Sequence, residues 1–283
     1  MSGKDKFTTW EEAVIWLRNQ PDQGQLMRDA FYDDPLADAA ERYFQSTEWK
    51  AVAALLSGRS GSALDVGAGR GIASYALARS GFEVTALEPD SSAVVGAAAI
   101  RDLAARAQLP IHVVEEFSER LPFAGGSFDV VFARAVLHHM RDLDDACREM
   151  FRVLRPGGVL IAAREHVISK EADLQQFLDQ HPLHHLYGGE RAYLLDRYTG
   201  ALKSAGFAAI ETLAPLRSPI NLFPYTMDTL RSAVIEGLTR KIPVGPLWRV
   251  VLASPRVFAS LLPLAERFDQ RPGRLYSFVC HKA

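Results

Sequence analysis

The chain has 283 residues and a net charge of −2, and its 48% hydrophobic and 23% charged residues are typical of a globular protein with one large or two small domains. Its two cysteines, Cys147 and Cys280, exclude a disulfide framework and a cysteine-based zinc site, and they favour a reducing compartment such as the cytoplasm. The near-neutral charge argues against a nucleic-acid binder, and we expect neither a signal peptide nor a transmembrane segment.

The first part of the chain predicts helices, and strands follow. Residues 7–20 carry apolar side chains every three or four positions behind Thr8 and Thr9, which can cap a helix, and residues 36–57 are also expected to be helical. From residue 63, short apolar runs alternate with helical patterns. The predicted strands are 63–66, 83–87, 111–114, 128–132 and 159–163, and the helices between them are 71–79, 91–108 and 142–154. This alternation predicts a parallel sheet covered on both faces.

The last part of the chain is less regular. Its predicted elements are helices at 171–180 and 191–205, a strand at 207–213, a helical layer at 225–270 and a final strand at 274–281. Because the chain ends on a strand, we expect it to return to the sheet after a helical excursion. The expected division is an N-terminal helical cap (1–60), an α/β core (61–216 plus 272–283) and a helical insert that forms a lid (217–271).

Positive charge is concentrated near the C-terminus. Residues 217–283 hold ten Lys and Arg but only four Asp and Glu, a net charge of +6. Such a section favours an anionic substrate or a lipid surface, although a solvated helical face is the simpler explanation.

The most informative stretch is the loop from Gly67 to Gly71, which links a predicted strand to a predicted helix. Its glycines allow the backbone to pass close to a ligand, and the helix N-terminus favours negative charge. A dinucleotide-binding fingerprint would need a third glycine at Ile72, so the loop is a poor NAD motif. Asp65 can accept a hydrogen bond from an ammonium group, and Glu88 can accept from a ribose diol. Asp90 is expected to cap the helix that follows, with Ser91 as the alternative cap.

Five motifs in order resemble those of class I S-adenosylmethionine-dependent methyltransferases, within the small-molecule branch that includes the ubiquinone and menaquinone enzymes. They are Asp65-Val-Gly-Ala-Gly-Arg-Gly71, Glu88, Leu121-Pro-Phe with Ser127-Phe-Asp-Val-Val131, Val136-Leu-His-His139 and Leu154-Arg-Pro-Gly-Gly158. The resemblance covers about residues 60–165. It implies a doubly wound, mostly parallel seven-stranded sheet of the Rossmann-like kind, with the last strand antiparallel.

The resemblance also implies the cofactor, S-adenosylmethionine, and a role for each matching position. Asp65 and the loop residues Gly67, Ala68, Gly69 and Gly71 would hold its methionine part, Glu88 its ribose, and Pro89 would lie near the adenine. Phe117 and Ser118 stand where the family usually has an acidic pair that meets the adenine amine, with Glu116 one residue early. The backbone at Ala133 and Arg134 would lie near the cofactor's amino group.

Six of the eight histidines follow the fourth and fifth predicted strands, where ligands bind in such sheets. A hydroxyl or ammonium acceptor needs a base, and we expect His139, then His184 or His185, then Glu165. A structural hydrogen-bonding role is the main alternative. A metal held by His181, His184, His185 and a carboxylate was considered, but no metal is expected.

The sequence therefore predicts S-adenosylmethionine-dependent methyl transfer to a small-molecule acceptor that is anionic or lipophilic. The alternatives are an NAD(P)-linked oxidoreductase and a non-catalytic cofactor-binding partner subunit. Nucleic acid is not expected as a partner, because no groove of basic and aromatic residues is evident. The oligomeric state stays open.

Overall fold

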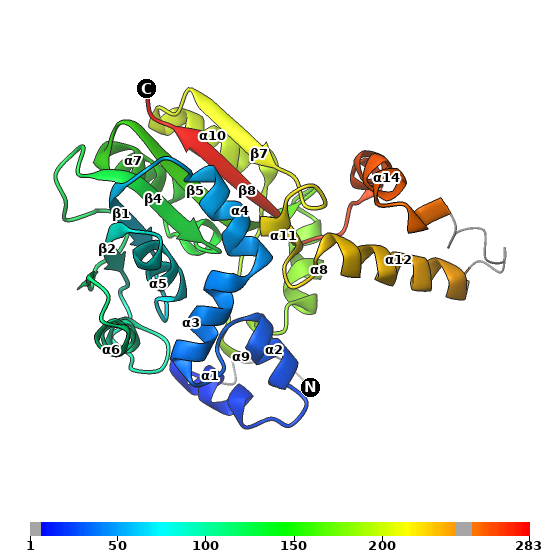
Figure 1. The fold of residues 1–283 in the computed structure, drawn as a ribbon, viewed down its shortest axis with the longest axis horizontal. Coiled ribbons are helices and arrows are strands. Elements are labelled where there is room, and N and C mark those ends of the chain that lie inside the picture. The colour runs from blue at the N-terminus through cyan, green and yellow to red at the C-terminus, as the bar shows by residue number, and fades with distance from the viewer. Residues whose placement is uncertain (1–6, 242–250) are drawn as a thin grey trace.

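A twisted β-sheet with helices on both faces forms the centre of the protein (Figure 1). The structure is a computed structural model that describes residues 7–241 and 251–283. Its strands are β1 (Gly61–Val66), β2 (Phe82–Leu87), β3 (Ile111–Val114), β4 (Phe128–Arg134), β5 (Leu154–Ile168), β6 (Tyr193–Leu194), β7 (Ala209–Leu213) and β8 (Arg274–His281).

The strands follow the order β3-β2-β1-β4-β5-β8-β7, and the short β6 pairs with β5. Strands β1 to β5 run parallel, whereas β8 is antiparallel to β5 and β7, so the predicted sheet with an antiparallel last strand is confirmed. The predicted number of seven strands was wrong by one. Tyr193 and Leu194, which were expected to be helical, pair with Val167 and Ile168 and extend the sheet.

The helices surround this sheet and also form a projection from it. They are α1 (Trp10–Arg18), α2 (Gly24–Asp29), α3 (Leu36–Gln45), α4 (Thr47–Leu55), α5 (Ile72–Arg79), α6 (Ala97–Ala107), the 3-10 turn η1 (Leu137–His139), α7 (Leu143–Val153), α8 (Asp173–Gln180), α9 (His184–Tyr187), α10 (Leu195–Ala205), α11 (Pro219–Leu222), α12 (Met227–Lys241) and α14 (Pro255–Phe268). None of the described helices is long and apolar enough to cross a lipid bilayer.

Helix capping explains where the predictions held and where they did not. Thr9 caps α1 as predicted, and its hydroxyl accepts from the Glu12 N–H at 3.2 Å. The predicted helix 36–57 is divided at Ser46, whose backbone is extended and whose hydroxyl caps α4. The prediction that Asp90 or Ser91 caps the next helix was wrong. The Asp90 carboxylate accepts from the Ser92 N–H in a turn, and α6 begins only at Ala97.

Alternation of side chains along the central strands produces two hydrophobic cores, one on each face. In β4, Val131 and Ala133 pack with residues of α7 and α10, whereas Val130 and Phe132 pack with residues of α4 and α5. Because both faces are covered, the ligand site is expected at the carboxyl edge of the parallel strands.

The two helical segments outside the core differ in where they lie. Helices α1 and α2 pack beside α9 through a cluster that includes Leu17, Met27 and Leu186. Helices α12 and α14 project away from the sheet in Figure 1 and pack on each other, with Phe258 and Leu262 at their contact. The chain then returns to the sheet as β8.

Candidate active site

A cavity of about 690 Å³ opens at the carboxyl ends of β1, β2, β4 and β5. This volume suits a cofactor or a drug-sized ligand. Of the ten residues predicted to bind the cofactor, all but Gly71 and Ala133 line it. Gly71 is the N-cap of α5. Ala133 is fully buried in the core, while the following residues Arg134 and Ala135 line the cavity.

The loop after β1 runs along one wall of the cavity. Gly67 and Gly69 have φ angles of +64° and +54°, in the left-handed region that disfavours a side chain. A Cβ at Gly67 would lie 2.8 Å from the Val136 side chain, so this position also has no room for one. A Cβ added at Gly69 would lie 3.9 Å from the Val95 carbonyl oxygen, which is an ordinary contact. Glycine is therefore favoured there by the backbone conformation and not by lack of space. The loop therefore presents bare backbone to the cavity.

Two buried carboxylates, Asp65 and Glu88, face the cavity on either side of this loop. The Asp65 carboxylate accepts from the Ser74 hydroxyl at 2.6 Å, and Glu88 accepts from the N–H groups of Gly69 at 2.7 Å and Asp90 at 2.9 Å. Burial raises the pKa of each to about 7, and the neighbouring Glu88 charge adds to the rise at Asp65. Within the described residues, neither carboxylate has an ion-pair partner. A ligand with an ammonium group and vicinal hydroxyls would supply the missing donors.

The two residues predicted to lie near the adenine differ in how accessible they are from the cavity. Phe117 lies on the wall and is 51% exposed, with the Arg141 guanidinium 4.8 Å from its ring centre. Its ring is thus available for stacking on a planar ligand. Ser118 is buried and its hydroxyl lies 2.6 Å from the Met140 sulfur, so an adenine contact would have to replace this pairing.

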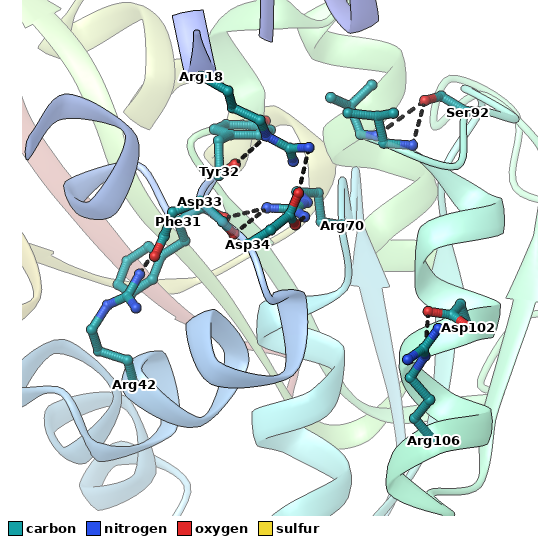
Figure 2. A network of polar contacts seen from close by, with 12 residues as sticks. Arg18, Phe31, Tyr32, Asp33, Asp34, Arg42, Arg70, Ser92, Asp102 and Arg106 are labelled. Carbon is teal, nitrogen blue, oxygen red and sulfur yellow. Dashed lines mark hydrogen bonds and ion pairs between the residues drawn. The ribbon is translucent and has the colours of Figure 1, made fainter. Parts of the chain in front are cut away.

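Arg70, inside the glycine loop, ties the N-terminal segment to the cavity (Figure 2). Its buried guanidinium donates to the carbonyls of Phe31 at 3.1 Å and Asp33 at 2.9 Å, and it pairs with the Asp34 carboxylate. Arg18 of α1 binds the same carboxylate at 2.6 Å. Phe31 therefore lies on the cavity wall, held there by the glycine loop itself. Sequence reasoning missed this role of Arg70, for which the sequence offers only the signal of a charged residue between two glycines, Gly69 and Gly71.

The domain that carries this site also matches known proteins. Residues 64–162 match the protein-family model described as a methyltransferase domain. This part of the chain is a methyltransferase domain. The predicted resemblance to methyltransferases is thereby confirmed for residues 64–162.

Curated relatives match a longer part of the chain than the family model does. The chain is 32% identical over 163 residues to the ubiquinone biosynthesis O-methyltransferase of Methylobacterium nodulans, which covers 56% of this chain and 64% of the relative. It is 31% identical over 188 residues to the 27-O-demethylrifamycin SV methyltransferase of Amycolatopsis mediterranei, which covers 65% and 66%. The chain thus spans less than two thirds of the length of these relatives.

Solved structures share the fold of the methyltransferase domain. The phosphoethanolamine N-methyltransferase 2 of Haemonchus contortus in complex with S-adenosyl-L-methionine has a TM-score of 0.51 and 18% identity, covering 92% of this chain and 61% of that chain. The [4+2]-cyclase SpnF has a TM-score of 0.51 and 23% identity, covering 87% and 80%. Since one of these is a cyclase, the fold alone does not determine the reaction.

On the far side of the methyltransferase domain's cavity, Glu165 organises the turn after β4. Its carboxylate accepts from the backbone N–H groups of Val136, Leu137 and His138 at 3.1 Å each. The same carboxylate lies 2.7 Å from Nδ1 of the His138 ring, which donates to it when Glu165 is ionised. Arg164, with a φ of +64°, interrupts the β5 ladder and turns Glu165 away from the face of Ala163. Glu165 is fully buried and does not line the cavity, so it positions η1 rather than facing a ligand.

The three predicted catalytic histidines lie in different places. His139 lines the cavity, its side chain is 43% exposed, and its Nδ1 is 3.2 Å from the Gly189 carbonyl oxygen. Partial burial and the neighbouring His138 lower its pKa below the usual value. Among the described residues along the cavity wall, neither His184 nor His185 appears. His185 instead lies with its Nε2 2.8 Å from the Asp179 carbonyl oxygen.

Three further residues reach the same cavity: His166, His181 and Glu190. Of these, sequence reasoning considered only His181, as a possible metal ligand. Burial raises the pKa of Glu190 to about 7 and lowers the pKa of His166 and His181. His166 and His181 were visible as histidines after strands, but Glu190 carries no local signal at all.

Proposed function

We propose that this chain is an S-adenosylmethionine-dependent methyltransferase that acts on a small-molecule acceptor. The observation that carries the proposal is the pair of buried carboxylates, Asp65 and Glu88, which flank bare loop backbone within a methyltransferase domain. Burial raises the pKa of both, and perturbed carboxylates in a cavity are typical of functional sites.

The residues along the glycine loop would hold the cofactor, which supplies an activated methyl group when bound. Asp65 would accept hydrogen bonds from its ammonium group, and Glu88 would accept them from the ribose hydroxyls. Pro89 and the exposed ring of Phe117 would lie against the adenine. Arg70 would act indirectly, because it holds Phe31 at the wall and so helps to exclude water from the cavity.

His139 would take the proton that a hydroxyl acceptor loses. A carbonyl oxygen can only accept, so the contact of its Nδ1 with the Gly189 carbonyl requires the hydrogen on Nδ1. In this tautomer the lone pair is on Nε2, and that atom can take a proton as a general base. The orientation of the ring is thus set by backbone and not by a second side chain.

The acceptor that the cavity favours is a lipophilic molecule with a hydroxyl group. Aromatic side chains from several segments line the cavity, among them Trp10, Phe31, Tyr32 and Tyr187. Both curated relatives named above are enzymes of O-methylation by their names, which supports a hydroxyl. We also propose a cytoplasmic location, because both cysteines are free and buried, as suits a reducing compartment.

Calorimetry with the full chain tests this proposal. We expect S-adenosylmethionine and S-adenosylhomocysteine to bind with dissociation constants of micromolar order, about −8 kcal/mol, and NAD not to bind. Glu88→Ala should weaken binding by about 1.5–3 kcal/mol. Tight NAD binding would instead favour the oxidoreductase. Cofactor binding without methyl transfer to any lipophilic hydroxyl compound in a labelled-methyl screen would favour the non-catalytic partner subunit.

A further inference from the structure

The Glu190 carboxylate lies among histidine rings without hydrogen bonding to any of them. Its oxygens are 3.9 Å from the His181 Nδ1, 3.7 Å from the His138 Nε2 and 3.8 Å from the His139 Nε2. These distances are too long for hydrogen bonds. The Glu190 side chain is only 12% exposed, so water from bulk does not solvate it freely.

The partners of the rings determine where their lone pairs are. His166 contacts the Gly273 carbonyl oxygen through Nδ1 at 3.1 Å, and a carbonyl oxygen can only accept, so the hydrogen is on Nδ1. His138 contacts the Glu165 carboxylate through Nδ1 in the same way, at 2.7 Å. The Nε2 atoms of both rings therefore carry lone pairs, and one of these, on His138, faces the Glu190 carboxylate. Two electron-rich groups that face each other repel, and a cation between them removes that repulsion, as would a proton or a bridging water.

A second observation comes from His181. Its Nδ1 is buried and has no hydrogen-bond partner among the residues that the structure describes, and a Glu190 oxygen lies 3.9 Å away. A buried nitrogen without a partner is costly, and such atoms call for a ligand, an ion or a water. One donor atom from each of His166, His181 and Glu190 lies within 4.8 Å of the other two.

We propose that His166, His181 and Glu190 bind one divalent transition-metal ion of the zinc or iron class. Two imidazoles and one carboxylate suit such ions, and three protein ligands leave coordination positions open for a ligand from the cavity. Donor atoms around a tetrahedral ion lie roughly 3.3–3.6 Å apart. The His181 and Glu190 donors are 3.9 Å apart and all three donors lie within 4.8 Å of one another, so the ligands would have to close around the ion. Mg²⁺ prefers oxygen donors, and this site offers it only one residue with oxygen.

The hydrogen bond made by the other ring nitrogen of His166 also supports a metal site. Metal-bound histidines usually donate their other ring N–H to a carbonyl or carboxylate, which orients the ring. The Gly273 carbonyl serves His166 in this way. His138 and His139 lie beside the ion site, and His139 keeps its Nε2 free for the proton transfer proposed above.

The metal also restricts the chemical class of the methyl acceptor, a step that rests on the proposed function. The site and the glycine loop line one cavity, so an ion there can coordinate an oxygen of the acceptor and lower the pKa of its hydroxyl. The acceptor class is then a hydroxyl compound with an oxygen able to bind a metal.

Metal titration of the full chain, without a histidine tag and after removal of metals by a chelator, tests the site directly. We expect one equivalent of Zn²⁺ by calorimetry and one of Co²⁺ by its visible absorption, with no saturable Mg²⁺ binding. His181→Ala and Glu190→Gln should each weaken Zn²⁺ binding at least tenfold. His185→Ala is the matched control, because that ring lies outside the cavity, and it should leave the affinity unchanged.

Several results would overturn the proposal: no binding of Zn²⁺ or Co²⁺ near one equivalent, or equal affinity in Glu190→Gln and wild type. Glu190→Gln keeps the side chain's size, so it remains informative if His181→Ala fails to fold. Cofactor calorimetry on the same metal-free samples separates the two proposals. Loss of Zn²⁺ binding with intact S-adenosylmethionine binding contradicts only the metal site, and the reverse contradicts only the proposed function.

Discussion

Arg134 at the end of β4 forms a two-point ion pair with Glu48 of α4, with Nε 2.5 Å from Oε1 and Nη2 3.0 Å from Oε2. Glu48 is fully buried, and Arg164 lies 3.6 Å from its second oxygen. Burial opposes ionisation, but the two guanidinium groups hold the pKa of Glu48 below its usual value. The pair joins the N-terminal helices to the carboxyl edge of the sheet, and Arg134 also lines the cavity.

Loss of one partner should destabilise the protein strongly. Glu48→Ala would leave Arg134 buried and unpaired, and we expect the free energy of unfolding in urea to fall by about 3–5 kcal/mol. Asp102→Ala is the control, because it breaks the mostly exposed pair with Arg106 that Figure 2 also shows. It should cost less than about 1 kcal/mol. Equal losses in the two variants would show that the Glu48 pair contributes no more than a surface pair.

The raised pKa of Asp65 predicts opposite effects on stability and on binding. Between about pH 4 and pH 7 the folded protein holds a proton on Asp65 that the unfolded chain has released, so stability should fall as pH rises through this window. Asp65→Asn removes that penalty while keeping an acceptor for Ser74. We expect the ligand-free variant to be more stable than wild type at pH 8, by urea denaturation. Its cofactor affinity should nevertheless fall by about 1.5–3 kcal/mol.

Cofactor binding should itself depend on pH. Because Asp65 and Glu88 bind donors best when ionised, the affinity of wild type for S-adenosylhomocysteine should rise from pH 6 to pH 8. Calorimetry in buffers of different ionisation enthalpy should detect proton release on binding near pH 6.5. A pH-independent affinity with no proton release would mean that neither carboxylate contacts the ligand.

His139 should affect turnover and not cofactor binding. Loss of a general base lowers rates by about 10²–10⁴-fold, so His139→Ala should lower kcat to that extent with an unchanged cofactor dissociation constant. His185→Ala should leave both unchanged, since that ring is bound to the Asp179 carbonyl outside the cavity. A His139→Ala variant with full turnover but a much lower melting temperature would assign the residue a structural role.

Hydrogen exchange can show whether the N-terminal helical cap or the insert expected to form a lid responds to the cofactor. Of the described residues in the insert 217–271, only Pro224 lines the cavity, whereas α1, α2 and residues 29–32 contribute several. We therefore expect the cofactor to protect residues 26–32 and to leave α12 and α14 unchanged. Arg70→Met should speed exchange at 31–34 without cofactor. Protection that appeared in α12 and not near residue 30 would identify the insert as the lid.

The sequence by itself determined those features that depend on neighbouring residues. The alternation of strands and helices, the left-handed glycine loop, the places of Asp65 and Glu88 at strand ends, and the returning strand β8 all follow from local patterns. The boundaries that were wrong, such as the start of α6 at Ala97, depend on which turn hydrogen bonds compete with the helix.

Only the tertiary structure decided which distant side chains meet. His166, His181 and Glu190 lie on a strand, after a helix and in a loop, and no spacing in the chain links them. The same is true of Arg70 with Asp34 and of Arg134 with Glu48. Strand register and loop paths set these distances, and both are determined by packing of the whole chain, because burial against remote segments outweighs local preference.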